Sequence, residues 1–461
     1  MTSTVAIIFF WACAGAVGAR TALPDLNLGK RIFLFGCFSL LSTYLAAVSA
    51  LWLISRGVIN PLLILLCCGF LFMVMGFCIN KLLERSGDRD GDGHYASVAY
   101  FEDVQADRRF QLFITSLFLV FFLSYAYRTL LEPLWGWDTL WYWAIVASNI
   151  ITEPLDGNWL FTAAPHPSTT PALLAIPVMG ENSGAGVHSI YWILTFASLL
   201  IMIYGQALAV TASKIYALIS AFFFATMPLA ENHASSSGYA ELFVCGSLFS
   251  FSTAFCFRLH NRFWLLLSCI LLLSLLITKN TGPLFLLIMA GAAFLQVLVD
   301  RGISYYLLMK FFFAWVVLAF LAAGYLQYLG HPIIFGYRML EFDVFRWPMI
   351  LVNEFHSKIF NQSFSVLPVL FFITLTAVLS NRVMKQTRFT FHDKPFFLFS
   401  IGGALAMLLF SQLTTYGFNG GQPESDTIMS RHSLPLAALL ISAMPYVYLI
   451  AISGSHRYKD S

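Results

Sequence analysis

The chain has 461 residues, of which 59% are apolar, 16% are aromatic and 11% are charged, and its mean hydropathy is +0.77. Because about a quarter of the residues of a soluble domain carry a charge, this composition excludes a soluble globular protein and indicates one that lies largely within a lipid bilayer. The net charge of +3 comes from basic residues spread between apolar runs, and such a distribution gives no basis for nucleic-acid binding.

Thirteen apolar runs have about the length that a helix needs to cross the hydrocarbon core of a membrane, roughly 20 residues. They comprise residues 2–18, 32–54, 58–79, 110–127, 187–209, 215–230, 239–257, 263–277, 283–299, 311–329, 364–379, 395–412 and 434–452. The first run has almost no basic residues before it, so we expect a membrane span there rather than a cleaved signal peptide. The predicted fold class is all-α, a polytopic bundle of about 13 transmembrane helices.

The basic residues between the spans are distributed unequally over the two faces of the predicted bundle. Nineteen of the 26 Lys and Arg residues fall in one of the two alternating sets of polar segments, and seven fall in the other. Since cytoplasmic loops carry the excess of Lys and Arg, the first set is predicted to be cytoplasmic. The N-terminus then lies outside, and the C-terminal tail lies in the cytoplasm.

This topology divides the chain into three parts. Residues 1–127 form N-terminal spans with a cytoplasmic linker at 81–109, residues 128–186 form a large outer loop, and residues 187–461 form a transmembrane core. Three further outer loops interrupt the core, at residues 231–238, 330–363 and 414–432. All eight cysteines fall inside apolar runs without the spacing of metal ligands, so neither a disulfide framework nor a cysteine metal site is expected.

Charged side chains are nearly absent from the predicted spans. Glu241 stands close to the outer end of its span, and Lys279 and Arg431 stand at outer span boundaries. A carrier of ions or charged solutes usually places such groups near the middle of the membrane. Their position at the outer edge therefore favours an enzyme that meets its substrate at the interface over a transporter.

The outer loop 128–186 contains the most informative stretch. Residues 138–150 have helical spacing, and Asp138 can act as the N-cap of that helix. Aromatic residues cluster at its start and suit a helix that lies in the membrane interface: Trp137, Trp141, Tyr142 and Trp143. His166 then precedes a second short helix at 168–175. A capping role for Asp138, a structural role for His166 and simple interfacial anchoring by the aromatic residues are the alternatives to function.

Five segments on the predicted outer face follow one another in the order WGWDTLWYW, APHPSTTPALLAIP, ENHASSSGYAEL, LITKNTGPLFL and RHSLPLAALL. In this order they resemble the motifs of the GT-C superfamily of integral-membrane glycosyltransferases, over about residues 132–452. The resemblance places Asp138 at the acidic position of the first-loop motif, Glu241 where Asp is commoner, and Lys279 with Asn280 in a K-N-E-G segment. The chain differs from the family in having one first-loop acid instead of an adjacent pair, and Thr281 where Glu is frequent.

Members of the GT-C superfamily use a polyprenyl-phosphate sugar as donor. The resemblance therefore implies a GT-C-like fold and sugar transfer to a hydroxyl acceptor on the periplasmic side of a bacterial inner membrane. Asp138 is the expected general base. The leaving phosphate gathers negative charge that cationic or N–H donors stabilise, and we expect His166, Lys279 and Arg431 in that role. The residues expected to bind the sugar or the acceptor are Glu241, His233, Trp137, Tyr142, Tyr239 and Asn280. For Glu241, holding a cation is an alternative role.

The partners implied by the resemblance are the polyprenyl-phosphate sugar donor, membrane lipids, and a secreted protein or glycolipid as acceptor. Among these activities, the family likeness and the chain length favour transfer of arabinofuranose to a pilin. No complete set of metal ligands is visible in the sequence, and because members of the family differ, the need for a divalent cation stays open. For His233, a solvent-facing position in its loop is an equal alternative to a binding role.

Two other hypotheses about the function of the chain make different predictions. An O-antigen-ligase or polymerase-like glycosyltransferase would depend on Arg338, Arg346 and His356 of a late outer loop, and Asp138 would be expendable. A flippase or transporter of lipid-linked sugars would move its substrate without breaking a bond, and the nearly charge-free spans give that reading little support.

Overall fold

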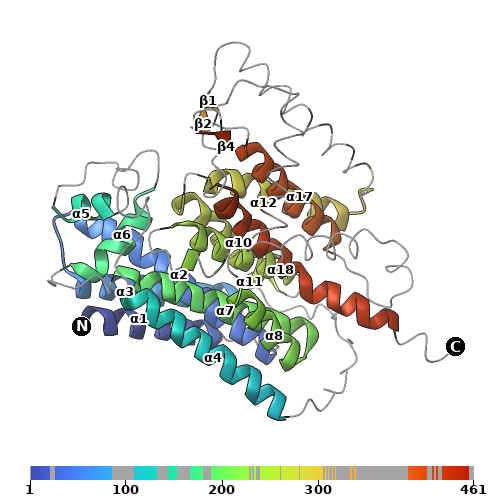
Figure 1. The fold of residues 1–461 in the computed structure, drawn as a ribbon, viewed down its shortest axis with the longest axis horizontal. Helices are drawn as coiled ribbons and strands as arrows, with labels where there is room; N and C mark the ends of the chain where they lie inside the picture. Colours follow the sequence, from blue (N-terminus) through green and yellow to red (C-terminus); the bar gives the residue numbers. More distant parts are fainter. Residues whose placement is uncertain are drawn as a thin grey trace. The chain divides into compact units, whose positions relative to one another are not determined.

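The computed structural model describes residues 2–20, 26–85, 108–131, 144–152, 167–179, 188–227, 230, 233–234, 239–259, 261–279, 281–304, 307, 310, 314, 317, 333–334, 337–338, 393–412, 418–419, 422–423 and 428–455. The described residues are almost entirely helical, which confirms the all-α prediction (Figure 1). The strands among them belong to two small antiparallel pairs, β1 (Ile333–Ile334) with β2 (Tyr337–Arg338) and β3 (Phe418–Asn419) with β4 (Gln422–Pro423).

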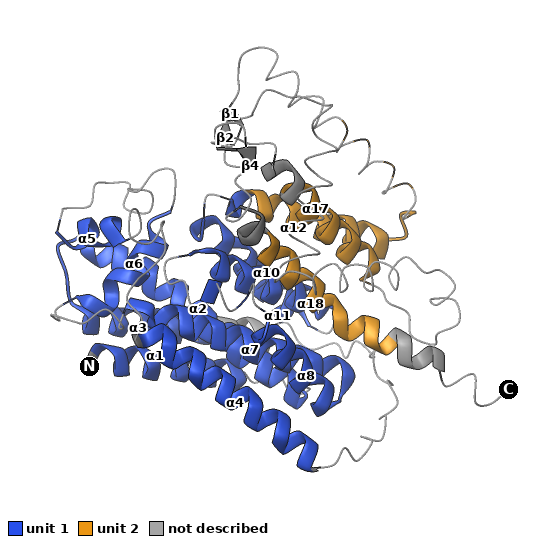
Figure 2. Cartoon of the chain, in the orientation of Figure 1, with its two compact units in different colours: residues 1–283 blue, residues 284–461 orange. Residues whose placement is uncertain are grey.

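The chain divides into two compact units, residues 1–283 and residues 284–461 (Figure 2). The first unit contains α1 (Thr2–Ala19), α2 (Leu28–Ile54), α3 (Pro61–Arg85), α4 (Arg108–Leu131), α5 (Ala144–Thr152), α6 (Thr169–Ala175), η2 (Ile176–Val178), α7 (Ile190–Thr211), α8 (Lys214–Ala225), α10 (Glu241–Cys256), α11 (Arg262–Leu273) and η4 (Ser274–Ile277). The second unit contains α17 (Lys394–Gln412), α18 (Ile428–Ser455) and all but the first two residues of α12 (Gly282–Asp300).

Four of the described helices are long and apolar enough to cross a membrane, judged by length and composition. They cover Leu28–Ile54, Arg109–Leu130, Ile190–Thr211 and Gly282–Asp300. Shorter apolar helices cover parts of the other predicted spans, whereas residues 364–379 and most of 311–329 lie outside the described residues. Several apolar helices that could span a membrane are therefore present, and the number thirteen stays a prediction.

Helices α2 and α7 pack at very short distance in the first unit because glycines line their contact. A Cβ added at Gly29 would lie 2.2 Å from the backbone nitrogen of Ala209, and one added at Gly205 would lie 2.4 Å from that of Phe33. Small residues allow this approach, and such contacts replace the hydrophobic drive that is absent between helices in lipid. Since residues early in α2 meet residues late in α7, the two helices are antiparallel.

The outward faces of α3 and α4 carry large apolar side chains that are mostly exposed. On α3 these include Phe70 and Met73, which are 61% and 67% exposed, and on α4 they include Val120, which is 66% exposed. Continuous apolar faces of this kind mark a surface that contacts a membrane or a partner. They are the faces expected of helices that lie against lipid.

In the second unit, a buried glutamine ties α12 to α17. The Gln296 side chain is fully buried; its Oε1 accepts a hydrogen bond from the backbone N–H of Phe396 at 3.0 Å, and its Nε2 donates to Asp300 Oδ1 at 2.8 Å. The first-turn N–H groups of a helix have no partner within the helix, so Gln296 caps the start of α17. The end of α12 and the start of α17 thus lie together.

Helix α18 begins earlier than the predicted span. It starts at Ile428, six residues before the apolar run at 434, and Arg431 therefore lies in the first turn of the helix and not in a loop. Hydropathy marks where side chains become apolar, whereas backbone hydrogen bonding continues through polar residues at the end of a span.

Candidate functional site

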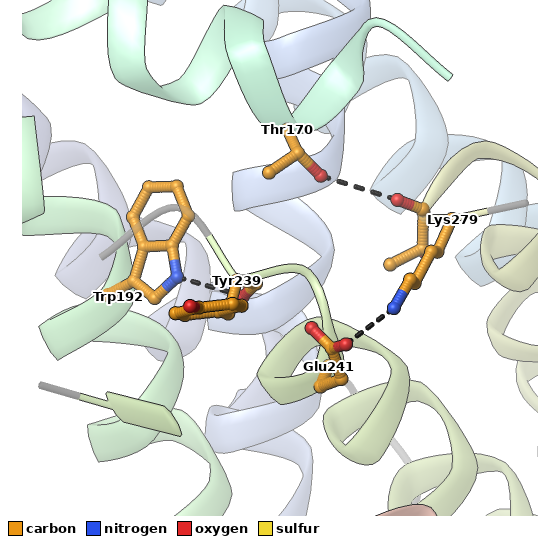
Figure 3. Close-up of polar contacts among 6 residues, drawn as sticks. Thr170, Trp192, Tyr239, Glu241 and Lys279 are labelled. Carbon is orange, nitrogen blue, oxygen red and sulfur yellow. Dashed lines mark hydrogen bonds and ion pairs between the residues drawn. The ribbon is translucent and has the colours of Figure 1, made fainter. Parts of the chain in front are cut away.

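The centre of the candidate site is an ion pair between Glu241 and Lys279 in the first unit. Lys279 Nζ contacts Glu241 Oε1, and the two side chains are only 3% (Glu241) and 11% (Lys279) exposed (Figure 3). Burial of a single charge is costly, and a buried charge is normally paired. Each of the two side chains therefore holds the other in place.

Glu241 is also placed where a helix favours an anion. It is the first residue of α10, so its carboxylate lies in the first turn, beside N–H groups that have no partner within the helix. The partial positive charge of a helix N-terminus stabilises a nearby carboxylate. The carboxylate thus interacts favourably with both the helix end and the Lys279 ammonium.

A glycine shapes the turn that carries Lys279. The backbone N–H of Gly282 donates to the carbonyl of Lys279 at 2.8 Å. A Cβ added at Gly282 would lie 1.8 Å from the carbonyl oxygen of Leu275, so no larger residue fits without a shift of the backbone. The glycine of the LITKNTG segment is therefore required by the close approach of the chain to η4.

Two threonines at the start of α6 bind the same turn from the other side. Thr169 Oγ1 donates to the carbonyl of Ile277. Thr170 Oγ1 donates to the carbonyl of Thr278 at 3.3 Å (Figure 3). Both threonines are 2% exposed. Since the last carbonyls of a helix need partners from outside it, the threonines supply them at the end of η4. The start of α6 is thereby attached to the residues directly before Lys279.

Tyr239 and His233 lie beside the ion pair, just before the start of α10. The indole Nε1 of Trp192 in α7 donates to the carbonyl of Tyr239 at 3.0 Å, just before α10 begins (Figure 3). The rings of His233 and Tyr239 meet edge to face, with centroids 6.1 Å apart. His233 is 5% exposed, so the alternative that placed it in contact with solvent is wrong. A histidine preceded by a polar Glu-Asn pair gave no sign of this burial in the sequence.

The structure brings together four of the residues predicted to form the site. Glu241, Lys279, Tyr239 and His233 lie in one region of the first unit. The other predictions fall on Asp138, His166, Trp137, Tyr142 and Asn280, which lie outside the described residues, and on Arg431, which lies in the second unit with its side chain outside the description. Their roles stay predictions.

Sequence reasoning missed Thr169, Thr170 and Trp192. Thr169 and Thr170 could have been recognised as a pair of threonines in the first turn of a predicted helix, because such hydroxyls often bond to backbone groups. Trp192 lies within an apolar run and looked like a packing residue. A buried indole N–H needs an acceptor, but only the packing of α7 shows that the acceptor is Tyr239.

Within the described ranges, no three His, Cys, Asp or Glu side chains gather into a group that could hold a metal ion. Comparisons with protein-family models, with curated proteins and with solved structures find no match to this chain. The site contains a cation held by a carboxylate, with aromatic and hydroxyl side chains around it. An ammonium has three N–H donors, so one that is held by a carboxylate can still donate to an anion.

Proposed function

We propose that the chain is a membrane glycosyltransferase of the GT-C type that transfers a sugar from a polyprenyl-phosphate donor to a hydroxyl acceptor on the non-cytoplasmic face. One observation carries the proposal. Three of the five segments that resemble GT-C motifs, separated by up to 108 residues, meet around the buried pair of Glu241 and Lys279. Convergence of separate polar segments on a buried charged pair supports a functional site.

The length of α10 supports a substrate whose charged group lies near the outer boundary of the hydrocarbon core. Helix α10 has 16 residues, which at 1.5 Å per residue is about 24 Å. The hydrocarbon core is about 30 Å thick. If the Arg258 end of α10 reaches the cytoplasmic interface, Glu241 and Lys279 lie about 6 Å inside the outer boundary of the hydrocarbon. A phosphate that is attached to a lipid chain is already at the membrane and can reach that depth. A free sugar phosphate would first have to leave the water.

The reaction assigned to these residues is a single displacement at the anomeric carbon. The acceptor oxygen forms a bond to that carbon, the bond from the carbon to the phosphate oxygen breaks, and the polyprenyl phosphate leaves with the bonding electrons. Asp138 takes the proton of the acceptor hydroxyl. Lys279, with His166, stabilises the negative charge on the leaving phosphate, and the same role for Arg431 stays a prediction from the sequence.

The ion pair favours one of the two roles predicted for Glu241. The sequence left open whether Glu241 orients the sugar hydroxyls or helps to hold a cation, and its contact with Lys279 favours the second role. A phosphate that binds Lys279 then shares with Glu241 an ammonium group that has three N–H donors. The proposed donors are lipid-linked sugars of a bacterial inner membrane, and the proposed acceptors are a pilin, which would receive arabinofuranose, another secreted protein or a glycolipid.

The test compares surface glycoconjugates by mass spectrometry in cells that lack the protein and in cells that express one of several full-length forms. These forms are the wild type, Asp138→Asn, Lys279→Gln and a control, Lys30→Gln, whose charge lies on the predicted cytoplasmic side. We expect one sugar increment to depend on the wild type and on Lys30→Gln. It should fall about 100-fold in Lys279→Gln, as when one stabilising donor is removed. A full increment in Asp138→Asn would refute the assigned base, and an increment independent of the protein would refute the function.

A further inference from the structure

A buried line of hydroxyl groups lies next to the ion pair, in the same unit. The Tyr44 hydroxyl of α2 donates to the carbonyl of Phe243 at 2.8 Å and lies 2.7 Å from Ser247 Oγ of α10. Ser247 Oγ lies 2.7 Å from Ser274 Oγ of η4, and Ser274 Oγ also contacts the carbonyl of Leu271 at 2.7 Å. Tyr44, Ser247 and Ser274 are 4%, 0% and 6% exposed. These hydroxyls therefore satisfy one another without water.

The protons of this line can be counted. Three hydroxyls have three protons, since each O–H donates once. They form four contacts: Tyr44 to a carbonyl, Tyr44 with Ser247, Ser247 with Ser274, and Ser274 to a carbonyl. Because Tyr44 and Ser274 each donate to a carbonyl, Ser247 donates to one of them, and one of these four contacts is without a proton. When the Tyr44 oxygen is removed, Ser247 can donate to Ser274 Oγ, and Ser274 donates to the carbonyl of Leu271. Neither buried serine hydroxyl is then left without a partner.

The line reaches both partners of the ion pair through the backbone. Phe243 is two residues after Glu241, in the first turn of α10. The Ser274 carbonyl accepts a hydrogen bond from Thr278 Oγ1 at 2.7 Å, and Thr278 directly precedes Lys279. One side chain of α2 therefore contacts the turn that carries the carboxylate and, through two serines, the turn that carries the ammonium.

From this geometry we infer that Tyr44 is a positioning residue: its hydroxyl sets the separation of the start of α10 and the end of η4, and thereby the approach of Lys279 to Glu241. Its effect on sugar transfer rests on the proposed function, whereas its effect on the ion pair does not. Tyr44 lies within a predicted span, where its sequence context indicates only an apolar packing residue.

The chain offers a matched control for Tyr44→Phe. Tyr191 in α7 is also buried, at 3% exposed, and its hydroxyl has no hydrogen-bond partner among the described residues. Tyr191→Phe deletes the same atom without deleting a hydrogen bond. Ser247→Ala is a second test variant, because it removes the hydroxyl that bonds to both Tyr44 and Ser274 while each of those hydroxyls keeps a carbonyl acceptor.

The experiment measures the rate at which an amine-reactive ester modifies Lys279 in the full-length protein in lipid nanodiscs, by peptide mass spectrometry. Lys30, at the start of α2, serves as the internal reference. We expect Tyr44→Phe and Ser247→Ala to raise the labelling rate of Lys279 at least threefold over Tyr191→Phe, with the rate at Lys30 unchanged. Equal rates at Lys279 in Tyr44→Phe and Tyr191→Phe would overturn the inference, and so would a parallel rise at Lys30, which indicates general loosening.

Transfer assays on the same variants test whether the position of the ion pair affects sugar transfer. We expect kcat/KM for the lipid-linked donor to fall roughly ten- to hundredfold in Tyr44→Phe, as small displacements of positioning groups do, with the KM for the acceptor unchanged. Faster labelling with unchanged transfer would overturn the link between the pair and the reaction. If the wild type transfers no sugar, the proposed function fails, and the labelling rates still decide whether Tyr44 positions the pair.

Discussion

The ion pair of Glu241 and Lys279 makes a quantitative prediction about stability. With exposed fractions of 3% and 11%, the two charges are largely removed from water. Loss of one partner from a buried pair costs about 3–5 kcal/mol, because the other charge remains buried and unpaired. We expect about 3 kcal/mol for Glu241→Met or for Lys279→Met, at the lower end because Lys279 keeps some contact with water.

The double variant distinguishes a paired site from two separate effects. Replacement of both partners of a buried pair by apolar residues is often neutral or stabilising, so Glu241→Met with Lys279→Met should unfold within about 1 kcal/mol of the wild type. The assay is reversible unfolding in mixed micelles, followed by circular dichroism, with Lys30→Met as a single-charge control. A double variant that loses about 6 kcal/mol, the sum of the single effects, would show that the two sites do not interact and would refute the reasoning.

Three further predictions follow, two from contacts in the structure and one from the predicted topology. Gly205→Ala places a Cβ 2.4 Å from a backbone nitrogen of α2 and should cost about 1–3 kcal/mol of unfolding free energy, whereas Gly291→Ala, with nothing within 4 Å, should be neutral or slightly stabilising. Tyr44→Phe should lower the free energy of unfolding by about 1 kcal/mol, and Tyr191→Phe should leave it nearly unchanged. A cysteine in place of Ser236 should react in intact cells with a thiol reagent that does not cross the membrane.

Each of these predictions has a contradicting result. Equal stability of the two glycine variants would mean that α2 and α7 do not approach through Gly205. Equal stability of the two tyrosine variants would mean that the Tyr44 hydrogen bonds contribute nothing to the folded state. Protection of the cysteine at position 236 until the cells are opened would reverse the predicted orientation of the chain.

The sequence predicted the helices well because their signal is local. A run of about 20 apolar residues identifies α2, α7 and α12 without knowledge of their neighbours. The charge distribution likewise assigned Glu241 and Lys279 to the same face. Helix ends were less accurate, as α18 shows, since a helix continues beyond the residues that lipid requires to be apolar.

The contacts within the site could not be predicted, because they depend on how distant segments pack. Glu241 and Lys279 are 38 residues apart, and their meeting requires a particular rotation of α10 against η4. The caps from Thr169 and Thr170 require that η4 end beside α6. The hydroxyl of Tyr44 becomes a contact only when α2 turns that side of the helix toward Ser247. Residue types and spacing do not specify such rotations.

The most direct test of the central claim is an analysis of both products in proteoliposomes that contain the full-length chain, a polyprenyl-phosphate sugar and a hydroxyl acceptor. We expect the wild type to yield equal amounts of glycosylated acceptor and free polyprenyl phosphate, and Lys279→Gln to yield about 100-fold less of both. Movement of the intact lipid-linked sugar across the bilayer, without release of polyprenyl phosphate, would contradict the claim and identify the chain as a flippase.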